Sequence, residues 1–200
     1  SWAVWIYHFM YKIVTSRSKV IVCHERLHDK DKSHLVYISR LDNEWLKNHK
    51  PALLNKARFL YVGRMLYDKG LNELLEAIKI INLNEVKCKL VLCGFTDSDN
   101  VSAVSTADLN KWSNLPGVDW IGSSNSVESI MAKVDCVVLA SYREGMPRSL
   151  LEAGSMGLPS IATDVPGCRN IISNEFNGFL CKSNSSRALV EVMEKVLSLT

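Results

Sequence analysis

Short apolar runs alternate with amphipathic stretches from Arg58 to the end of the chain. The apolar runs predict strands at residues 59–63, 88–94, 117–122, 136–140, 158–163 and 178–181. Between them, apolar residues recur at helical spacing, first at Leu71, Leu74, Leu75 and Ile78. A second such stripe, near the end, consists of Leu189, Val192, Met193, Val196 and Leu197. Strands that alternate with helices predict an α/β fold with a doubly wound, Rossmann-like parallel sheet.

Local signals predict where the shorter helices begin. Residues 106–112 predict one short helix. Asn125 and Glu128 have the spacing of a capping box, which predicts that another helix opens at Asn125. Pro147 predicts the first helical position after the strand at 136–140, because that position needs no backbone N–H.

Residues 1–57 follow a different pattern, and their chemistry indicates no function. Residues 2–14 are apolar and aromatic, too short to span a bilayer, and predict a core helix. A helix on a membrane surface, or part of a larger domain, are the alternatives. Residues 18–23 and 34–39 predict strands, and residues 42–54 a helix or turn that Pro51 breaks.

Composition narrows the class of protein. A chain of 200 residues with 47% hydrophobic and 22% charged residues suits one folded domain, here residues 58–200, with an appendage. The net charge of +3 permits phosphate-bearing ligands but gives no indication of nucleic-acid binding. His24 and His28 have ligand spacing, but no carboxylate completes a set, so we predict no metal site.

Cysteine usage and the missing secretory signal both favour a cytosolic protein. No CxxC pair occurs, and most of the cysteines stand inside apolar runs, so we predict reduced, buried thiols. The six cysteines are Cys23, Cys88, Cys93, Cys136, Cys168 and Cys181.

Two cations follow the first strand of the predicted domain. Gly63 ends that strand, and Arg64 and Lys69 lie in the loop before the helix that starts near Leu71. Two fixed cations at the rim of a sheet could hold a diphosphate. Taken alone, the same residues equally suit solvated loop charges.

The loop after the strand at 136–140 is the second candidate site. Amides at the start of the next helix form an anion site at the carboxyl end of a strand. Its residues are Glu144, Gly145, Met146, Pro147, Arg148, Ser149 and Glu152. Two glutamates at this spacing are more often surface residues, and sequence spacing does not give the carboxylate distance that defines a glycosidase.

The run EGMPRSLLEA at residues 144–153, followed by GLPSIATDVPGCR at 157–169, resembles the signature of retaining GT-B glycosyltransferases of family 4. The pattern GRxxxxKG at 63–70 matches the place where these transferases carry an Arg and a Lys on the donor diphosphate. The resemblance covers most of residues 58–200 and little of residues 1–57. Members with similar motifs build bacterial capsule, O-antigen or other surface glycans from nucleotide sugars.

The resemblance implies a role for each matching residue. Arg64 and Lys69 would bind the diphosphate, and Glu144 would bind hydroxyls of the donor sugar and support positive charge near its anomeric carbon. Glu152 would bind the ribose hydroxyls, while Gly122 and Ser123 would pack against the base. Stereochemistry would be retained, with no metal or other cofactor.

Two features qualify these roles. Pro147 has no N–H and departs from the commoner EGFG motif, which removes one backbone contact to the donor. Asp164 and Arg169, in the second half of the match, are expected to hold their loop rather than to perform chemistry.

The resemblance also implies the architecture and the partners. Residues 58–200 would be the carboxyl-terminal, donor-binding half of a GT-B enzyme, with the acceptor-binding half missing. Such a fragment would be inactive alone, and no His seen here is assigned to the histidine that the other half supplies. The donor would be a nucleotide-diphosphate sugar, with uridine diphosphate favoured. The acceptor would be a glycan or a lipid-linked sugar, reached in the cytoplasm at the inner face of the plasma membrane.

Two other functions stay open at this point. The chain could be a non-catalytic nucleotide-sugar binding module that acts with a separate acceptor-domain subunit. It could also be a GT-B epimerase of nucleotide sugars, although its motifs fit that group less well.

Overall fold

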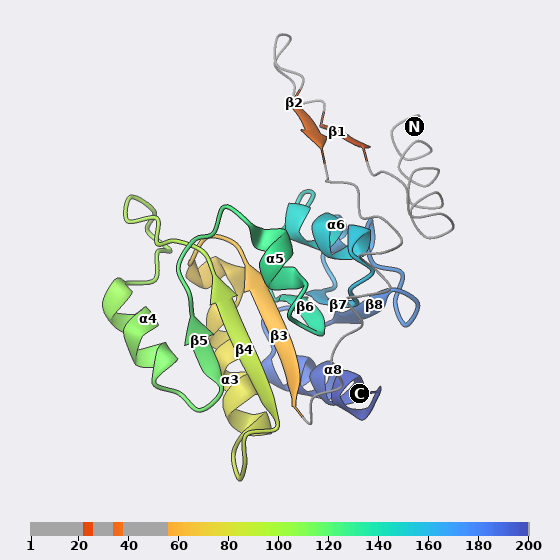
Figure 1. The fold of residues 1–200 in the computed structure, drawn as a ribbon. Helices are drawn as coiled ribbons and strands as arrows, with labels where there is room; N and C mark the ends of the chain where they lie inside the picture. The colour runs from red at the N-terminus through yellow and green to blue at the C-terminus, as the bar shows by residue number, and fades with distance from the viewer. Residues whose placement is uncertain (1–21, 26–33, 38–55, 200) are drawn as a thin grey trace.

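The computed structural model describes residues 22–25, 34–37 and 56–199. Its main feature is a six-stranded parallel sheet with the order β5-β4-β3-β6-β7-β8 (Figure 1). The strands are β3 (Ala57–Val62), β4 (Cys88–Cys93), β5 (Val118–Trp120), β6 (Cys136–Leu139), β7 (Ser160–Thr163) and β8 (Gly178–Cys181). The prediction of a doubly wound, Rossmann-like sheet is confirmed.

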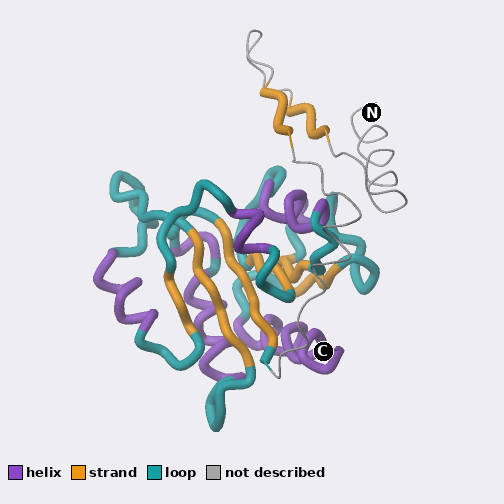
Figure 2. The backbone as a smooth tube through the Cα atoms, viewed as in Figure 1, coloured by secondary structure: helices purple, strands orange, loops and turns teal. Residues whose placement is uncertain are grey.

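Helices lie on both faces of this sheet (Figure 2). They are η1 (Tyr67–Lys69), α3 (Leu71–Ile81), α4 (Thr106–Ser113), α5 (Val127–Met131), α6 (Arg148–Ser155), α7 (Pro166–Arg169) and α8 (Ser186–Leu199). Helices α3 and α8 pack together on one face, and α5 and α6 lie on the opposite face. No helix within residues 56–199 has the length and apolar character needed to cross a membrane.

The apolar runs form the core. All four residues of β6 are buried, and Phe59, Leu60 and Tyr61 of β3 have no exposed surface. The two helical stripes also face inward, since Leu74 and Ile78 of α3 are buried, as are Leu189, Val192, Met193 and Val196 of α8. Buried apolar side chains are the main favourable term in folding, so the hydrophobic pattern is enough to specify this sheet and its long helices.

The cysteine prediction agrees with the structure. The free, buried thiols are Cys88, Cys93, Cys136, Cys168 and Cys181. Burial raises the pKa of the Cys88 and Cys136 thiols to about 12, so both stay protonated and unreactive near neutral pH. The side chain of Cys23 lies outside the described residues.

Two helix starts differ from the prediction by one residue. The N-cap of α5 is Ser126, not Asn125; its φ of −133° and ψ of 65° are not helical, and its hydroxyl donates to the Glu128 carboxylate instead of capping a helix amide. Pro147 is the N-cap of α6 rather than its first residue, because its ψ of 110° is extended. The short helices η1 and α7 were not predicted, since neither is long enough to show a period.

The amino-terminal predictions are tested only in part. Strand β1 (Val22–Glu25) lies slightly later than the predicted strand at 18–23, and pairs antiparallel with β2 (His34–Tyr37), which falls within the predicted 34–39. The predicted helix at residues 2–14, the predicted helix or turn at residues 42–54, and His28 lie outside the described residues.

The order in which successive strands are added to the sheet reverses between β3 and β6. From β3 the chain proceeds outward to β4 and β5, and from β6 it proceeds the other way to β7 and β8. Parallel sheets of this type bind ligands outside the carboxyl ends of the two strands at such a switch point. The fold therefore places the loops after β3 and β6 side by side.

Gly70 allows these two loops to approach. Its φ is 69°, and an added Cβ would lie 2.1 Å from the carbonyl oxygen of Ala140, directly after β6. Glycine adopts this left-handed conformation without strain and leaves room for the neighbouring backbone.

We expect Gly70→Ala to lower the free energy of unfolding by at least about 2 kcal/mol, because it combines backbone strain with a clash against a carbonyl. Gly154→Ala is the matched control, since residue 154 is an exposed position of helix α6 and a Cβ there would meet nothing within 4 Å. It should raise stability by about 0.5 kcal/mol. Urea unfolding measures both, and equal effects of the two variants would contradict the assigned contact.

Candidate functional site

The carboxyl ends of the strands on one side of the switch point are joined by backbone contacts. The Gly63 amide donates to the Cys93 carbonyl at 3.0 Å, and the Gly94 amide donates to the Gly122 carbonyl at 2.8 Å. Gly63 and Gly94 approach so closely that a Cβ on Gly94 would lie 1.8 Å from the Gly63 oxygen. Gly94 ends an apolar run as Gly63 does, but this pattern alone does not predict the close backbone contact.

Two of the predicted site residues meet across the switch point. Lys69, at the end of η1, places Nζ 2.9 Å from Oε1 of Glu144, in the loop after β6. The side chains are 22% and 13% exposed, so solvent screens this pair less than an ordinary surface ion pair. The structure thus joins residues that stand 75 positions apart in the sequence.

Arg64 has a different partner. Its Nη1 donates to Oδ2 of Asp97 at 2.7 Å, and the Arg64 side chain is 48% exposed. Arg64 and Lys69, the two residues predicted to bind a diphosphate, are therefore each paired with a carboxylate. Asp97 stands in the polar loop after β4, which has no periodicity that would single it out.

A hydrogen bond from the buried side chain of Tyr61 holds the turn that carries Arg64. The hydroxyl of buried Tyr61 donates to the carbonyl oxygen of Arg64 at 2.7 Å. Burial is the main cause of a raised pKa for Tyr61, so its hydroxyl stays protonated and keeps donating.

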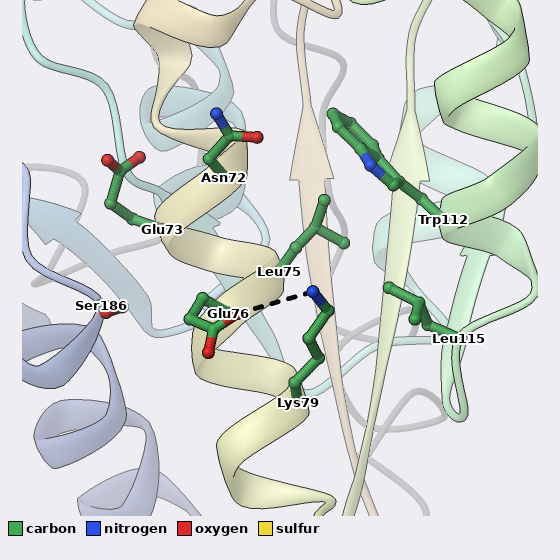
Figure 3. Close-up of a pocket in the computed structure, with 8 residues that line it drawn as sticks. All are labelled: Asn72, Glu73, Leu75, Glu76, Lys79, Trp112, Leu115 and Ser186. Atoms are coloured by element: carbon green, nitrogen blue, oxygen red, sulfur yellow. Dashed lines mark ion pairs between the residues drawn. The ribbon is translucent and has the colours of Figure 1, made fainter.

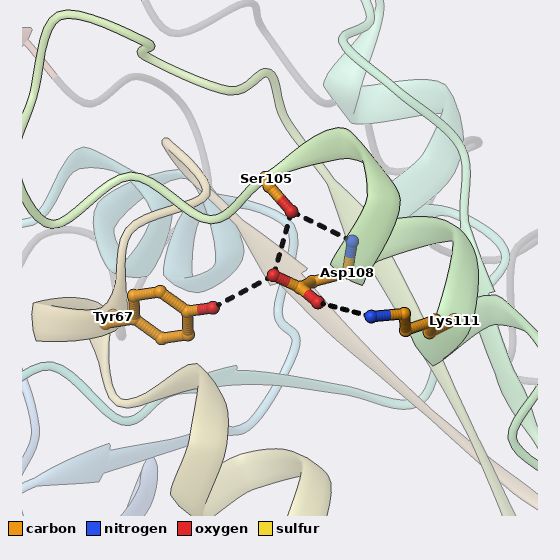
Figure 4. Close-up of polar contacts among 4 residues, drawn as sticks. All are labelled: Tyr67, Ser105, Asp108 and Lys111. Atoms are coloured by element: carbon orange, nitrogen blue, oxygen red, sulfur yellow. Dashed lines mark hydrogen bonds and ion pairs between the residues drawn. The ribbon is translucent and has the colours of Figure 1, made fainter.

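The η1 turn is fastened to α4 on its other side (Figure 4). The hydroxyl of Tyr67 donates to Oδ2 of Asp108 at 3.4 Å, and the same oxygen accepts from Ser105 at 2.8 Å. Ser105 also caps α4 by accepting from the Asp108 amide, and Lys111 pairs with Asp108 at 3.2 Å. Hydrogen bonds from Ser105 are the main cause of a lowered pKa for Asp108, so the carboxylate that holds Tyr67 stays ionised.

The loop that carries Glu144 is held by β7 and α7. Thr163 Oγ1 donates to the carbonyl of Ser141 at 2.5 Å, and the Gly167 amide donates to the carbonyl of Glu144 at 3.2 Å. A Cβ on Gly167 would lie 2.4 Å from that carbonyl, so only glycine permits this approach. Gly167 lies in the run GLPSIATDVPGCR, but the resemblance implied no role for it.

The start of α6 presents the predicted amides. Arg148 and Ser149 are the first two helical residues, whose N–H groups have no carbonyl partner inside the helix. Leu150 and Ala153 are buried and fix the helix on the sheet, while the Met146 side chain is 45% exposed. Nothing lies within 4 Å of a Cβ placed on Gly145 or Gly122, so both glycines border open space.

Glu152 lies one turn into α6. Its carboxylate forms no hydrogen bond or ion pair with the residues that the structure describes. Burial is the main cause of a raised pKa for Glu152; the charge of Arg148 opposes this shift, and that of Glu128 adds to it. A half-buried carboxylate without a partner is unfavourable in the free chain, which is typical of a functional position.

Asp164 and Arg169 hold the connection between β7 and α7. Arg169 Nε donates to Asp164 Oδ1 at 2.5 Å, and another guanidinium nitrogen donates to the Asp164 carbonyl at 3.0 Å. The expectation that this pair holds its loop agrees with the geometry.

A groove of about 410 Å³ lies elsewhere, on the flank of α3 (Figure 3). It is lined by Asn72, Glu73, Leu75, Glu76, Lys79, Trp112, Leu115 and Ser186. None of these is a predicted site residue, and Lys79 already pairs with Glu76 at 3.5 Å. Within residues 56–199 no group of three or more potential ligands could hold a metal ion. The Lys69–Glu144 pair and the amides at the start of α6 make the carboxyl edge of the sheet the candidate site.

Relatives and solved structures resemble this chain over the same region. The Staphylococcus aureus capsular polysaccharide biosynthesis glycosyltransferase CapM is 29% identical over 160 residues, covering 80% of this chain and 42% of that protein. An Escherichia coli UDP-Gal:alpha-D-GlcNAc-diphosphoundecaprenol alpha-1,3-galactosyltransferase is 30% identical over 145 residues, covering 71% and 37%. This chain thus spans less than half the length of these two relatives.

Two solved structures show the same fold. The apo form of the lipopolysaccharide outer core galactosyltransferase WaaB has a TM-score of 0.61 and 26% identity, covering 75% of this chain and 43% of that one. The C-terminal domain of a glycosyl transferase group 1 family protein (LpcC) from Francisella tularensis has a TM-score of 0.59 and 23% identity. In that case the match covers 80% of this chain and 84% of the solved domain.

The family model described as glycosyl transferases group 1 matches residues 42–200, which include every predicted site residue. Given this match and the two relatives, the chain belongs to the glycosyl transferases group 1 family.

Proposed function

We propose that this chain is the donor-binding half of a retaining GT-B glycosyltransferase, and that it binds a nucleotide-diphosphate sugar at the carboxyl edge of its sheet. The observation that carries the proposal is the Lys69–Glu144 pair at the switch point, with Nζ and Oε1 2.9 Å apart. A cation for the diphosphate and a carboxylate for the sugar thus stand together, beside the first amides of α6, which have no carbonyl partner inside the helix.

The ion pairs of the free chain indicate how the diphosphate would bind. Oxygens of Glu144 and Asp97 accept from Lys69 and Arg64 where phosphate oxygens would accept in the complex. The exposed Arg64–Asp97 pair contributes at most about 1 kcal/mol, so a diphosphate can displace Asp97 at little cost. Lys69 has three N–H donors, so it can keep Glu144 while it binds the ligand.

The site can stabilise the charges of glycosyl transfer. When the bond to the anomeric carbon breaks, negative charge grows on the diphosphate and positive charge grows on the sugar ring. Lys69, Arg64 and the amides of Arg148 and Ser149 would stabilise the first, and Glu144 the second. Because these groups are placed before the reaction, they need no reorganisation during it, and they supply the charge that a metal supplies in other transferases.

Glu152 and the strand ends would bind the nucleoside. Glu152 is a carboxylate without a hydrogen-bond or ion-pair partner among the described residues, and ribose hydroxyls are suitable donors to it. Gly122 and Ser123 follow β5 and border open space where a base could pack. We propose uridine diphosphate as the nucleotide, which agrees with the UDP-Gal donor in the name of the Escherichia coli relative.

The same relative suggests the acceptor. Its name specifies a sugar on diphosphoundecaprenol, and the Staphylococcus aureus relative is named for capsular polysaccharide biosynthesis. We propose that the whole enzyme transfers its sugar to a glycan or lipid-linked acceptor at the cytoplasmic face of the membrane. An acceptor-binding domain would complete the cleft.

Lys69→Ala should weaken the binding of UDP about tenfold or more, because it removes a charge-assisted hydrogen bond to the diphosphate. The binding of uridine should change less than twofold, since uridine has no phosphate. Calorimetric titration of the 200-residue chain with UDP, GDP, ADP and uridine measures both effects and the base preference.

Lys79→Ala is the control for that titration. It removes a lysine from an ion pair on α3 that lies outside the candidate site, so UDP affinity should equal that of the unmodified chain. A Lys69→Ala chain that binds UDP as the unmodified chain does would place the diphosphate elsewhere.

Glu152→Gln should weaken UDP binding yet stabilise the free chain at neutral pH. The folded-state pKa of Glu152 is raised above its ordinary 4.5. Ionisation of Glu152 therefore costs folding stability as the pH rises from the ordinary pKa through the raised one. The stability advantage of the glutamine variant should therefore be full at pH 7 and shrink below pH 4.5. Urea unfolding at both pH values measures it, and an advantage independent of pH would contradict the assigned cause.

A further inference from the structure

Tyr142 joins the loop after β6 to the segment after β3. Its backbone amide donates to the carbonyl of Asp68 at 3.0 Å, and its hydroxyl donates to Oε1 of Glu73 at 2.8 Å. Asp68 is the neighbour of Lys69 in η1, and Glu73 lies in the first turn of α3. Tyr142 therefore links the loop that carries Glu144 to the segment that carries Lys69.

Glu73 has an unusual environment for this contact. As the third residue of α3 it could have capped the helix, but its carboxylate accepts from Tyr142 instead. Its second oxygen, Oε2, is buried and has no hydrogen-bond partner among the described residues. A buried polar atom without a partner costs stability, although the positive end of the α3 dipole offsets part of this cost.

The hydroxyl of Tyr142 is a permanent donor. Burial, followed by the hydrogen bond and the charge of Glu73, raises the pKa of Tyr142 to about 12. The hydroxyl thus stays protonated throughout the physiological range. A neutral donor to an ionised acceptor forms a stronger hydrogen bond than two neutral groups do.

The other contacts of the loop lie on its opposite side. The carbonyls of Ser141 and Glu144 accept from Thr163 and Gly167, which belong to β7 and α7. Tyr142 stands between these two anchored positions and is tied to α3. The place of the Glu144 backbone is therefore determined from two sides, and on one of them the Tyr142 side chain adds a second bond to that of the Tyr142 amide.

We propose that the Tyr142–Glu73 hydrogen bond is a positioning contact that sets the Glu144 carboxylate against Lys69, and that it thereby governs affinity for the donor sugar rather than for the nucleotide. The proposal rests on the proposed function, in which Glu144 meets the sugar. Glu152 and the amides of α6 belong to a helix that Leu150 and Ala153 fix on the sheet. Arg64 and Lys69 stand on turns that the Tyr61 and Tyr67 hydroxyls hold, so the nucleotide contacts do not depend on the Tyr142 side chain.

The test compares UDP with UDP-galactose by calorimetry. Tyr142→Phe removes only the hydroxyl, and Glu73→Leu removes only the acceptor. Each should weaken UDP-galactose binding about tenfold while UDP affinity changes less than twofold, because a misplaced carboxylate loses its hydrogen bonds to the sugar. The double variant should be no weaker than either single variant, since both remove the same contact.

Two control variants separate positioning from a general structural effect. Glu73→Gln keeps an oxygen that accepts from Tyr142, so it should retain UDP-galactose affinity within about twofold. Lys79→Ala removes a side chain from the same helix α3 that pairs with Glu76, not with the loop, and should also retain it. The proposal is overturned if Tyr142→Phe weakens UDP as much as UDP-galactose, or if Glu73→Gln is as harmful as Glu73→Leu.

Amide hydrogen exchange of the free chain tests the contact without a ligand. In Tyr142→Phe the amides of residue 142 and Gly167, which tie the loop through the carbonyls of Asp68 and Glu144, should exchange faster, while those of α8 keep their protection. Glu73→Gln should behave as the unmodified chain does. Unchanged exchange in Tyr142→Phe overturns the positioning role. If the unmodified chain binds neither UDP nor UDP-galactose, the proposed function is wrong, and so is the proposal that this contact governs affinity for the donor sugar. The exchange result then decides separately whether the contact positions the loop.

Discussion

The close approach of Gly70 to the Ala140 carbonyl brings the loop after β3 against the loop after β6. The Lys69–Glu144 pair, the Tyr142–Asp68 backbone bond and the Tyr142–Glu73 bond all join these same two segments. Each requires that the backbones meet within the reach of a side chain. The arrangement of charge at the switch point is thus a consequence of one backbone contact that glycine alone allows.

The two ion pairs of the site differ in what they cost to open. Lys69 and Glu144 are mostly buried, and removing one of them would leave the other charge without a partner in a poorly solvated place. Arg64 and Asp97 are much more exposed, so water can replace either partner at little cost. The buried pair is therefore part of the framework, while the exposed pair is a reversible contact of a polar loop.

The sequence predicted the elements better than the contacts between them. Apolar runs such as 136–140 and the stripes of α3 and α8 appear in the structure because burial acts on patterns that a chain shows locally. Helix starts were missed by one residue at Ser126 and Pro147, because the backbone angles of single residues decide them. The four residues of α7 are too few to show a period.

The site was predictable as an edge of the sheet but not as a set of pairs. Residue types and the strand ends placed Lys69 and Glu144 on the same edge, yet their contact depends on the order of strands in space. Asp97 and Glu73 gave no signal, since each owes its role to a partner distant in the sequence. Such pairings follow from tertiary packing, which a local pattern does not encode.

The glycines of the edge divide it into positions that can change and positions that cannot. Gly70, Gly94 and Gly167 face backbone atoms, so a side chain there would push two segments of the fold apart. Gly145 borders open space and has no positive φ, so a new side chain could project there without disturbing its neighbours. Divergence in ligand preference can therefore begin at residue 145 while the rest of the edge keeps its shape.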